Sequence, residues 1–130
     1  MSLRAALLLA PLLLLAACST PRPYAPVDDV RYTAIGADPF WMVTIGDDRI
    51  VLRLAGTEGP REESWPRTLP ATRDGVTRWE SGAGTRVIAV EARKSGGSCT
   101  HGGVRFEDQV RVTLSGRMLE GCGGRIVAAR

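Results

Sequence analysis

The sequence of 130 residues is poor in the side chains and motifs on which enzyme catalysis depends. It contains a single histidine, His101, and no Gly-x-Ser-x-Gly motif of the kind that presents a nucleophilic serine. The glycine-rich stretch 97–103 lacks the Lys-Ser/Thr pair with which a phosphate-binding loop closes. With one histidine and no recognisable nucleophile, we expect a protein that is not an enzyme and that has no cofactor.

Carboxylates do not compensate for this absence. The acidic residues include four adjacent pairs, which are Asp28-Asp29, Asp47-Asp48, Glu62-Glu63 and Glu107-Asp108. General acid–base catalysis needs two carboxylates that converge in a cleft. These pairs are neighbours in the sequence at expected turns and loops, and we therefore expect ordinary solvated residues.

Aromatic residues are scarce as well, at 5% of the chain, and the basic residues outnumber the acidic ones only slightly, by 17 to 14. All basic residues but Lys94 are arginines, and they are scattered along the chain. A nucleic-acid surface would combine clustered basic residues with interleaved aromatic ones. The composition favours a solvated surface of mixed charge, and we expect no nucleic-acid partner.

No apolar run is long enough to span a membrane permanently. Arg4 is followed by 13 apolar residues, 5–17, whereas a membrane-spanning helix needs about 20. A positive start, a short apolar run and small residues at its end are typical of a secretion signal. We therefore expect residues 1–17 to be a signal peptide that takes no part in the fold.

The end of this run, Leu15-Ala16-Ala17-Cys18, resembles the lipobox of bacterial lipoproteins. The resemblance implies cleavage before Cys18 and lipidation of that residue, which anchors the chain to a lipid bilayer. Because Ser19 rather than Asp follows the cysteine, it also implies sorting to the outer membrane, with the protein facing the periplasm. Residues 18–29, which are rich in proline, are then an extended tether, and residues 30–130 are the folded domain.

Lipidation of Cys18 would leave one pair of cysteines, Cys99 and Cys122, in an oxidising compartment that permits a disulfide. A two-residue hairpin turn at Ser115-Gly116 would set Cys122 opposite Gln109, near the glycine-rich loop that carries Cys99. The loop-entropy model gives such a disulfide about 3 kcal/mol of stabilisation. We expect the disulfide Cys99–Cys122.

A metal site made of Cys99, His101 and Cys122 is the alternative use of these residues. Zinc usually takes four ligands, and the spacing supplies no evident fourth. Oxidised cysteines would also lack the thiolates that bind metal. We expect no metal site.

Beyond the tether, the hydrophobic pattern has a period of two rather than 3.6. Apolar and polar residues alternate in the segments 40–45, 49–54, 85–93 and 109–114. Such alternation indicates strands with one buried face. Weaker candidates are 30–35, 76–80, 118–122 and 125–129. We expect an all-β domain, a small antiparallel meander of about six to eight strands that curls into a barrel or packs as a sandwich.

Residues 56–72 interrupt the pattern. The segment carries three prolines, and its charges follow no period. These features predict a long loop, a kind of segment that is often functional. Within it, Trp65 is expected to fold back as a lid or as an edge strand.

The stretch Gly36-Ala37-Asp38-Pro39-Phe40-Trp41 is the most distinctive of the domain. Asp38, which precedes a proline, is expected to be extended, and Phe40 and Trp41 then point to opposite faces of a strand. One interpretation makes Trp41 a core residue and Phe40 a partner of the tether or the lid. The other makes Phe40 part of an apolar binding surface, with Trp41 and Trp65 as further candidates.

Over residues 32–123 the chain resembles an uncharacterised group of small bacterial envelope lipoproteins. Their domain opens with Gly-x-Glu-Pro-Phe-Trp, which corresponds to the motif at Gly36, with Asp38 in place of Glu. A cysteine follows late, and a later strand pair ends in Gly-Cys; Cys99 and Gly121-Cys122 stand at these places. The resemblance implies an envelope β-domain without implying a specific activity.

These observations predict an envelope lipoprotein whose β-domain is a binding or scaffolding module for an envelope protein or the cell wall. One alternative is an inhibitor of a cell-wall hydrolase such as lysozyme, although Ser81-Gly82 is not followed by the tyrosine of the known inhibitor motif. Another is a carrier of small apolar ligands, which requires an open apolar cavity.

Overall fold

The computed structural model describes residue 27 and residues 29–129. The predicted signal peptide 1–17, the lipidation site Cys18 and all of the tether 18–29 except residues 27 and 29 lie outside the described residues. In the described part of the chain there are nine strands and no helix. Consequently, no described helix is long and apolar enough to cross a membrane.

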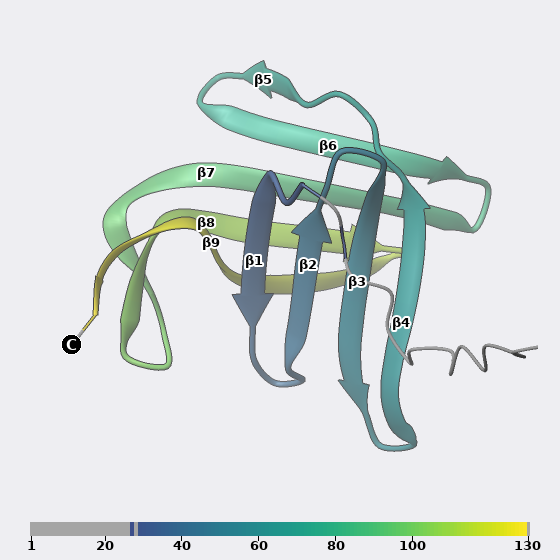
Figure 1. Ribbon diagram of the computed structural model, residues 1–130, viewed down its shortest axis with the longest axis horizontal. Helices are drawn as coiled ribbons and strands as arrows, with labels where there is room; N and C mark the ends of the chain where they lie inside the picture. Colours follow the sequence, from purple (N-terminus) through teal and green to yellow (C-terminus); the bar gives the residue numbers. More distant parts are fainter. Residues whose placement is uncertain (1–26, 28, 130) are drawn as a thin grey trace, which may run out of the picture.

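The nine strands form one antiparallel sheet in the order β4-β3-β2-β1-β9-β8-β7-β6-β5. Their bounds are β1 Tyr32–Gly36, β2 Trp41–Ile45, β3 Arg49–Gly56, β4 Gly59–Pro66, β5 Ala71–Arg73, β6 Val76–Ala83, β7 Arg86–His101, β8 Val104–Leu114 and β9 Arg117–Ala129. The sheet curls into a half-barrel, and β1–β4 run across the direction of β6–β9 (Figure 1). The predicted all-β class is confirmed, with nine described strands rather than about six to eight.

The core fills the concave side of this sheet. Trp41, Val43 and Ile45 of β2 are fully buried, and they pair with Leu54, Leu52 and Ile50 of β3, which also face inward. On the opposite wall, alternate residues of β7 and β8 are buried in the same way, including Ile88, Val90, Val110 and Val112. The apolar residues that recur with a period of two in the sequence are therefore the ones whose side chains pack in one shared core.

The segment 56–72 is not the long loop that its composition predicts. Strand β4 pairs with β3 along its whole length, from Gly56↔Gly59 to Arg49↔Pro66, and β5 begins at Ala71. Trp65 lies in this edge strand, which is one of the two predicted arrangements, and it is buried. The loop prediction is wrong because Pro60 and Pro66 lie near the ends of an edge strand, where a missing N–H is tolerated, and Pro70 lies between β4 and β5.

The curl is closed by side chains of β4 and the neighbouring end of the β6–β7 hairpin. The indole N–H of Trp65 donates to the carbonyl oxygen of Arg86 at 3.1 Å. The hydroxyl of Ser81 donates to the carbonyl oxygen of Pro66 at 2.6 Å. These bonds hold β4 against β6 and β7, although β4 is a neighbour of neither strand in the sheet.

The predicted disulfide Cys99–Cys122 is confirmed, with its two Cα atoms 5.6 Å apart. As predicted from a two-residue turn at Ser115-Gly116, Cys122 lies opposite Gln109. On β7 the pairing with β8 shifts between Lys94 and Cys99, so residues 95–98 bulge out of the ladder. The disulfide links β7 to β9 across the intervening β8, and it leaves neither sulfur as a thiolate for a metal.

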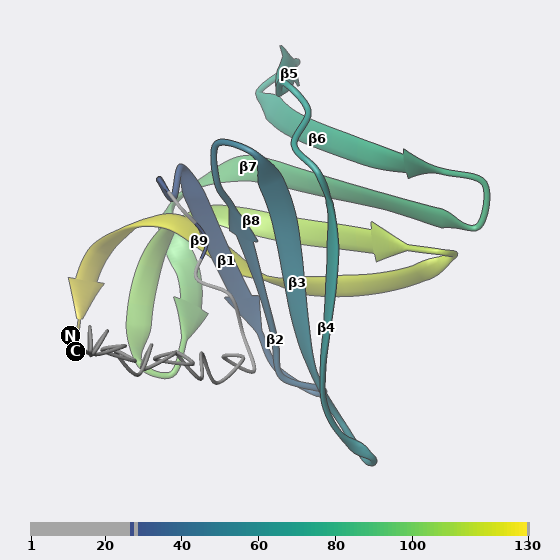
Figure 2. The same cartoon turned by 45° about the vertical axis from the view of Figure 1, so that its right-hand side comes forward.

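Beyond these irregularities, the distal parts of β7, β8 and β9 bend away from the rest of the sheet (Figure 2). The pairing of β8 with β9 shifts around Phe106, as expected for strands that turn a corner at a bulge. The weak strand candidates 118–122 and 125–129 are accordingly one continuous strand, β9. The glycine-rich stretch, expected as a loop, belongs largely to β7.

The turn between β1 and β2 also differs from its prediction. Gly36 pairs directly with Trp41, so the chain reverses over the four residues between them. Asp38 has a φ of 61°, in the left-handed region that Asp tolerates better than most residues. The predicted turn into a strand is present, but Asp38 itself takes a left-handed conformation rather than the extended one expected before a proline.

The indole of Trp41 packs against two glycines, Gly36 of β1 and Gly121 of β9, which we call the glycine shelf. An ideal Cβ on Gly36 would lie 2.2 Å from Nε1 of Trp41, and one on Gly121 would lie 2.8 Å from Cζ2 and 2.0 Å from the carbonyl oxygen of Ile35. Nε1 of Trp41 has no hydrogen-bond partner among the described residues. The ring is thus held by close packing, which requires that both glycines lack side chains.

Gly121→Ala is therefore expected to destabilise the protein by about 2 kcal/mol or more, because the new methyl group must displace backbone as well as the Trp41 ring. Glu120→Ala, at the neighbouring exposed position, should change the free energy of unfolding by about 0.5 kcal/mol at most. Denaturant unfolding of the two variants measures the difference. Equal stability of the two would contradict the shelf.

Candidate functional site

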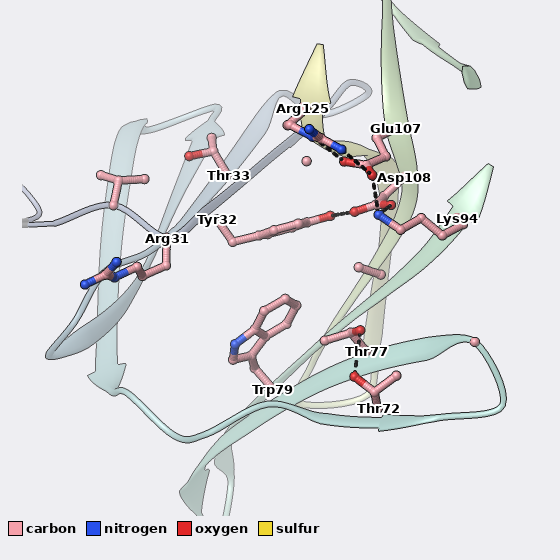
Figure 3. A pocket seen from close by; sticks show the side chains of 14 residues that line it. Arg31, Tyr32, Thr33, Thr72, Thr77, Trp79, Lys94, Glu107, Asp108 and Arg125 are labelled. Carbon is pink, nitrogen blue, oxygen red and sulfur yellow. Dashed lines mark hydrogen bonds and ion pairs between the residues drawn. The ribbon is translucent and has the colours of Figure 1, made fainter. Parts of the chain in front are cut away.

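A cavity of about 600 Å³ opens where β1 meets β6, β7, β8 and β9, and we call it the mouth pocket. Figure 3 shows Tyr32 and Trp79 at its centre, a cluster of charged side chains on one side and two threonines on the other. It lies at the edge of the buried core, since Trp79 and Ala92 belong to both. The concave face of the sheet, rather than a loop, therefore provides the site.

Tyr32 and Trp79 form the aromatic centre of the pocket. Their ring centroids are 4.9 Å apart, and their planes are tilted by 35°. Tyr32 begins β1 and Trp79 lies in β6, strands that are distant in the sheet order. The curl of the sheet is what brings the two rings together.

The hydroxyl of Tyr32 donates a hydrogen bond to Oδ2 of Asp108 at 2.8 Å. Asp108 is only 5% exposed. Two glycines of β9 make room for this bond: an ideal Cβ on Gly123 would lie 2.9 Å from the Tyr32 oxygen, and one on Gly124 would lie 2.7 Å from Oδ2. Burial, and next the hydrogen bond to Asp108, raise the pKa of Tyr32, so this phenol stays protonated and is no nucleophile.

A cluster of ion pairs borders the carboxylate of Asp108. The ammonium of Lys94 donates to Glu107 and lies 3.4 Å from Oδ1 of Asp108. The guanidinium of Arg125 contacts both carboxylate oxygens of Glu107, at 3.3 and 3.4 Å. Arg125 and then Lys94 lower the pKa of Glu107 to about 2. Glu107 in turn raises the pKa of Lys94, so both groups are charged at neutral pH.

A bulge on β9 lies opposite Glu107, at the charged side of this pocket. Phe106 pairs with Ile126 and Asp108 pairs with Gly123, so two residues of β9 stand opposite Glu107 alone. Adjacent residues of a regular strand point to opposite faces, but the bulge changes the local direction of β9, so both Gly124 and Arg125 line the pocket. The prediction that Glu107-Asp108 is an ordinary solvated pair is wrong, because the two residues lie within a long strand and Asp108 is buried.

The other side of the pocket is uncharged. The hydroxyls of Thr72 in β5 and Thr77 in β6 lie 3.0 Å apart. Arg31 points away from the aromatic pair (Figure 3) and forms a bidentate ion pair with Asp47, at 2.6 and 3.0 Å. The pocket thus combines aromatic faces, hydroxyls and one charged side, formed by Lys94, Glu107, Asp108 and Arg125, which we call the charged wall.

The three aromatic residues proposed from the sequence do not lie in this pocket. Trp41 and Trp65 are buried in the core, so they offer no surface to a partner. Phe40 is 46% exposed, and its ring centroid lies 6.5 Å from that of His101. Of the candidate binding surface, only Phe40 is accessible, and its ring lies near His101 at the end of β7.

Sequence reasoning missed Tyr32, Trp79, Lys94 and Asp108 as a group. They come from four strands, and nothing in their spacing indicates that they meet. The available signal was the acidic pair Glu107-Asp108, which directly precedes a segment in which apolar and polar residues alternate as in a strand. Reading the strand from Val104 rather than from Gln109 would have placed Asp108 on the inward face, together with Val110 and Val112.

Comparisons of the chain with protein-family models, curated proteins and solved structures found no match. Among the described residues, no group of three or more His, Cys, Asp or Glu side chains is placed to hold a metal ion. What the mouth pocket can do therefore follows from its own geometry. It can enclose a small molecule between aromatic faces and charged groups.

The pKa of Glu107 tests the geometry of the charged wall. We expect Arg125→Gln to raise it from about 2 toward the ordinary value of 4.5, because the largest stabilisation of the carboxylate is lost. The stabilisation linked to this depressed pKa is present above about pH 4.5 and is lost as the pH falls toward 2.

Carbon-13 NMR of the glutamate carboxyl groups during an acid titration measures this pKa. Arg111→Gln is the matched control, since Arg111 pairs with Glu120 rather than with Glu107. A pKa near 4.5 for Glu107 in the unmodified protein would show that the ion-pair cluster does not form in solution.

Proposed function

We propose that this protein is a lipid-anchored binding module of the cell envelope and that its ligand binds in the mouth pocket. The observation that carries the proposal is the pocket itself, with the adjacent, tilted rings of Tyr32 and Trp79 near the charged groups around Asp108. Ligand sites are typically concave, largely preformed and lined by aromatic groups together with a few polar ones. The mouth pocket has each of these properties.

The two alternative functions have less support. The concave side of the sheet is filled by buried apolar side chains, whereas a carrier of apolar ligands needs open space there. Ser81 and Gly82 lie within β6, and the Ser81 hydroxyl is bonded to Pro66, so this dipeptide is not a protruding loop. We therefore propose neither a carrier nor a hydrolase inhibitor.

The lipid anchor is proposed on the resemblance of residues 15–18 to a lipobox. Cys18→Ser should abolish the incorporation of radiolabelled palmitate and release the protein from the membrane fraction, because the acylated side chain is lost. Cys99→Ser is the control, and it should still be labelled if it accumulates. Continued labelling of the Cys18→Ser protein would overturn the anchor.

Binding in the mouth pocket is testable with the unanchored Cys18→Ser protein. A library of small polar and aromatic fragments, followed by amide chemical shifts in NMR spectra, should give hits that perturb Tyr32, Trp79 and Asp108. Thr77→Trp should remove these hits by filling the pocket, because Thr77 lines it. Thr57→Trp, in the exposed β3–β4 turn, is the matched control and should leave them unchanged.

Hits that cluster elsewhere, for example around Phe40, would contradict the proposed location. The absence of any fragment binding to the folded protein would contradict the proposed function as a whole. Either result is read against the fragment-free spectrum of the same sample.

A further inference from the structure

One oxygen of the buried carboxylate in the mouth pocket lacks a hydrogen bond. Oδ2 of Asp108 accepts from Tyr32, but Oδ1 accepts from no donor among the described residues. Figure 3 shows this carboxylate pointing into the pocket beside the Tyr32 hydroxyl. A buried carboxylate oxygen without a donor is costly, and a ligand that donates a hydrogen bond to it would remove that cost.

The chain itself indicates which kind of donor the site accepts. The cation next to Oδ1 is the ammonium of Lys94, which forms an ion pair with this oxygen at 3.4 Å and donates a hydrogen bond to Glu107. The Lys94 side chain is 68% exposed and approaches from the rim. The position next to Oδ1 therefore already attracts a primary ammonium, although the 3.4 Å separation is longer than that of a well-formed charge-assisted hydrogen bond.

The aromatic pair completes a site for a cation. The Tyr32 ring reaches this carboxylate through its hydroxyl, and the Trp79 ring lies against Tyr32, with the two centroids 4.9 Å apart. A cation over the face of such rings is attracted by their π electrons. An aromatic wall combined with a buried carboxylate favours a protonated amine over a neutral or an anionic group. Arg125 and Lys94, the cations of the wall, are both engaged by Glu107 and are less available to an anion.

We propose that the mouth pocket recognises its ligand through a protonated primary amine that donates to Oδ1 of Asp108 and lies against Tyr32 and Trp79. This inference rests on the proposed function and specifies the chemical class of the ligand. Lys94 competes with the ligand, because its ammonium occupies the neighbouring position.

The test compares three probes of one shape: benzylamine, benzyl alcohol and benzoate. Each is titrated into the Cys18→Ser protein at neutral pH, and amide shifts of the pocket residues report binding. Benzylamine should bind most tightly. Asp108→Asn, which keeps an acceptor for Tyr32, should weaken benzylamine binding about tenfold or more. Lys94→Gln should tighten it by roughly threefold, because a competing charge is removed from a largely exposed position.

Asp74→Asn is the matched control, since it removes one negative charge from a fully exposed site in the β5–β6 turn. It should leave the affinity for benzylamine unchanged. Lys94→Gln changes an exposed side chain, so it keeps the test decisive even if Asp108→Asn fails to fold.

Three outcomes would overturn the amine site and leave the pocket as a binding site. They are equal binding of benzyl alcohol, weaker benzylamine binding in Lys94→Gln, and preferential binding of benzoate that is lost in Lys94→Gln. If none of the three probes binds while other fragments do occupy the pocket, the amine inference fails alone. If nothing binds the pocket, the proposed function fails with it.

Discussion

The packing of Trp41 on Gly36 and Gly121 is the constraint on which the rest of the structure depends. The indole extends from β2 across β1 to β9, and it can do so only where two strands carry no side chain. Its position joins the β1–β4 part of the sheet to the β6–β9 part at the centre of the core. The curl that follows brings β1 near β6, and with them Tyr32 near Trp79. A packing requirement in the core thus creates the pocket at its edge.

The charged wall depends on a second feature, the departure of β7, β8 and β9 from regular pairing. The bulge of β9 opposite Glu107 brings both Gly124 and Arg125 to the pocket, and the disulfide Cys99–Cys122 links the distal parts of β7 and β9. Strands bent in this way present polar groups at the edge of an apolar core without interrupting it. The binding proposal follows from this arrangement, because the aromatic and charged halves of the pocket belong to one continuous sheet.

The parts of the fold that could be predicted from the sequence are those determined by local pattern. The alternation of apolar and polar residues predicted β2 and β3. The two-residue turn at Ser115-Gly116 predicted the register in which Cys122 lies opposite Gln109. Strand β4 was missed because its partner β3, and not its own composition, makes it a strand. The site was missed because Asp108 is buried through contacts with Tyr32 and Lys94, residues on other strands. Contacts between strands that meet only because the sheet curls produce no periodic pattern in the sequence, so they could not be predicted from it.

The most direct test of this account is a nuclear Overhauser spectrum of the Cys18→Ser protein. The account predicts cross-peaks from the indole protons of Trp41 to the Hα protons of both Gly36 and Gly121, together with cross-peaks between the rings of Tyr32 and Trp79. Contacts of Trp41 with only one glycine, or the absence of contact between the two rings, would contradict the curl and the pocket that it forms.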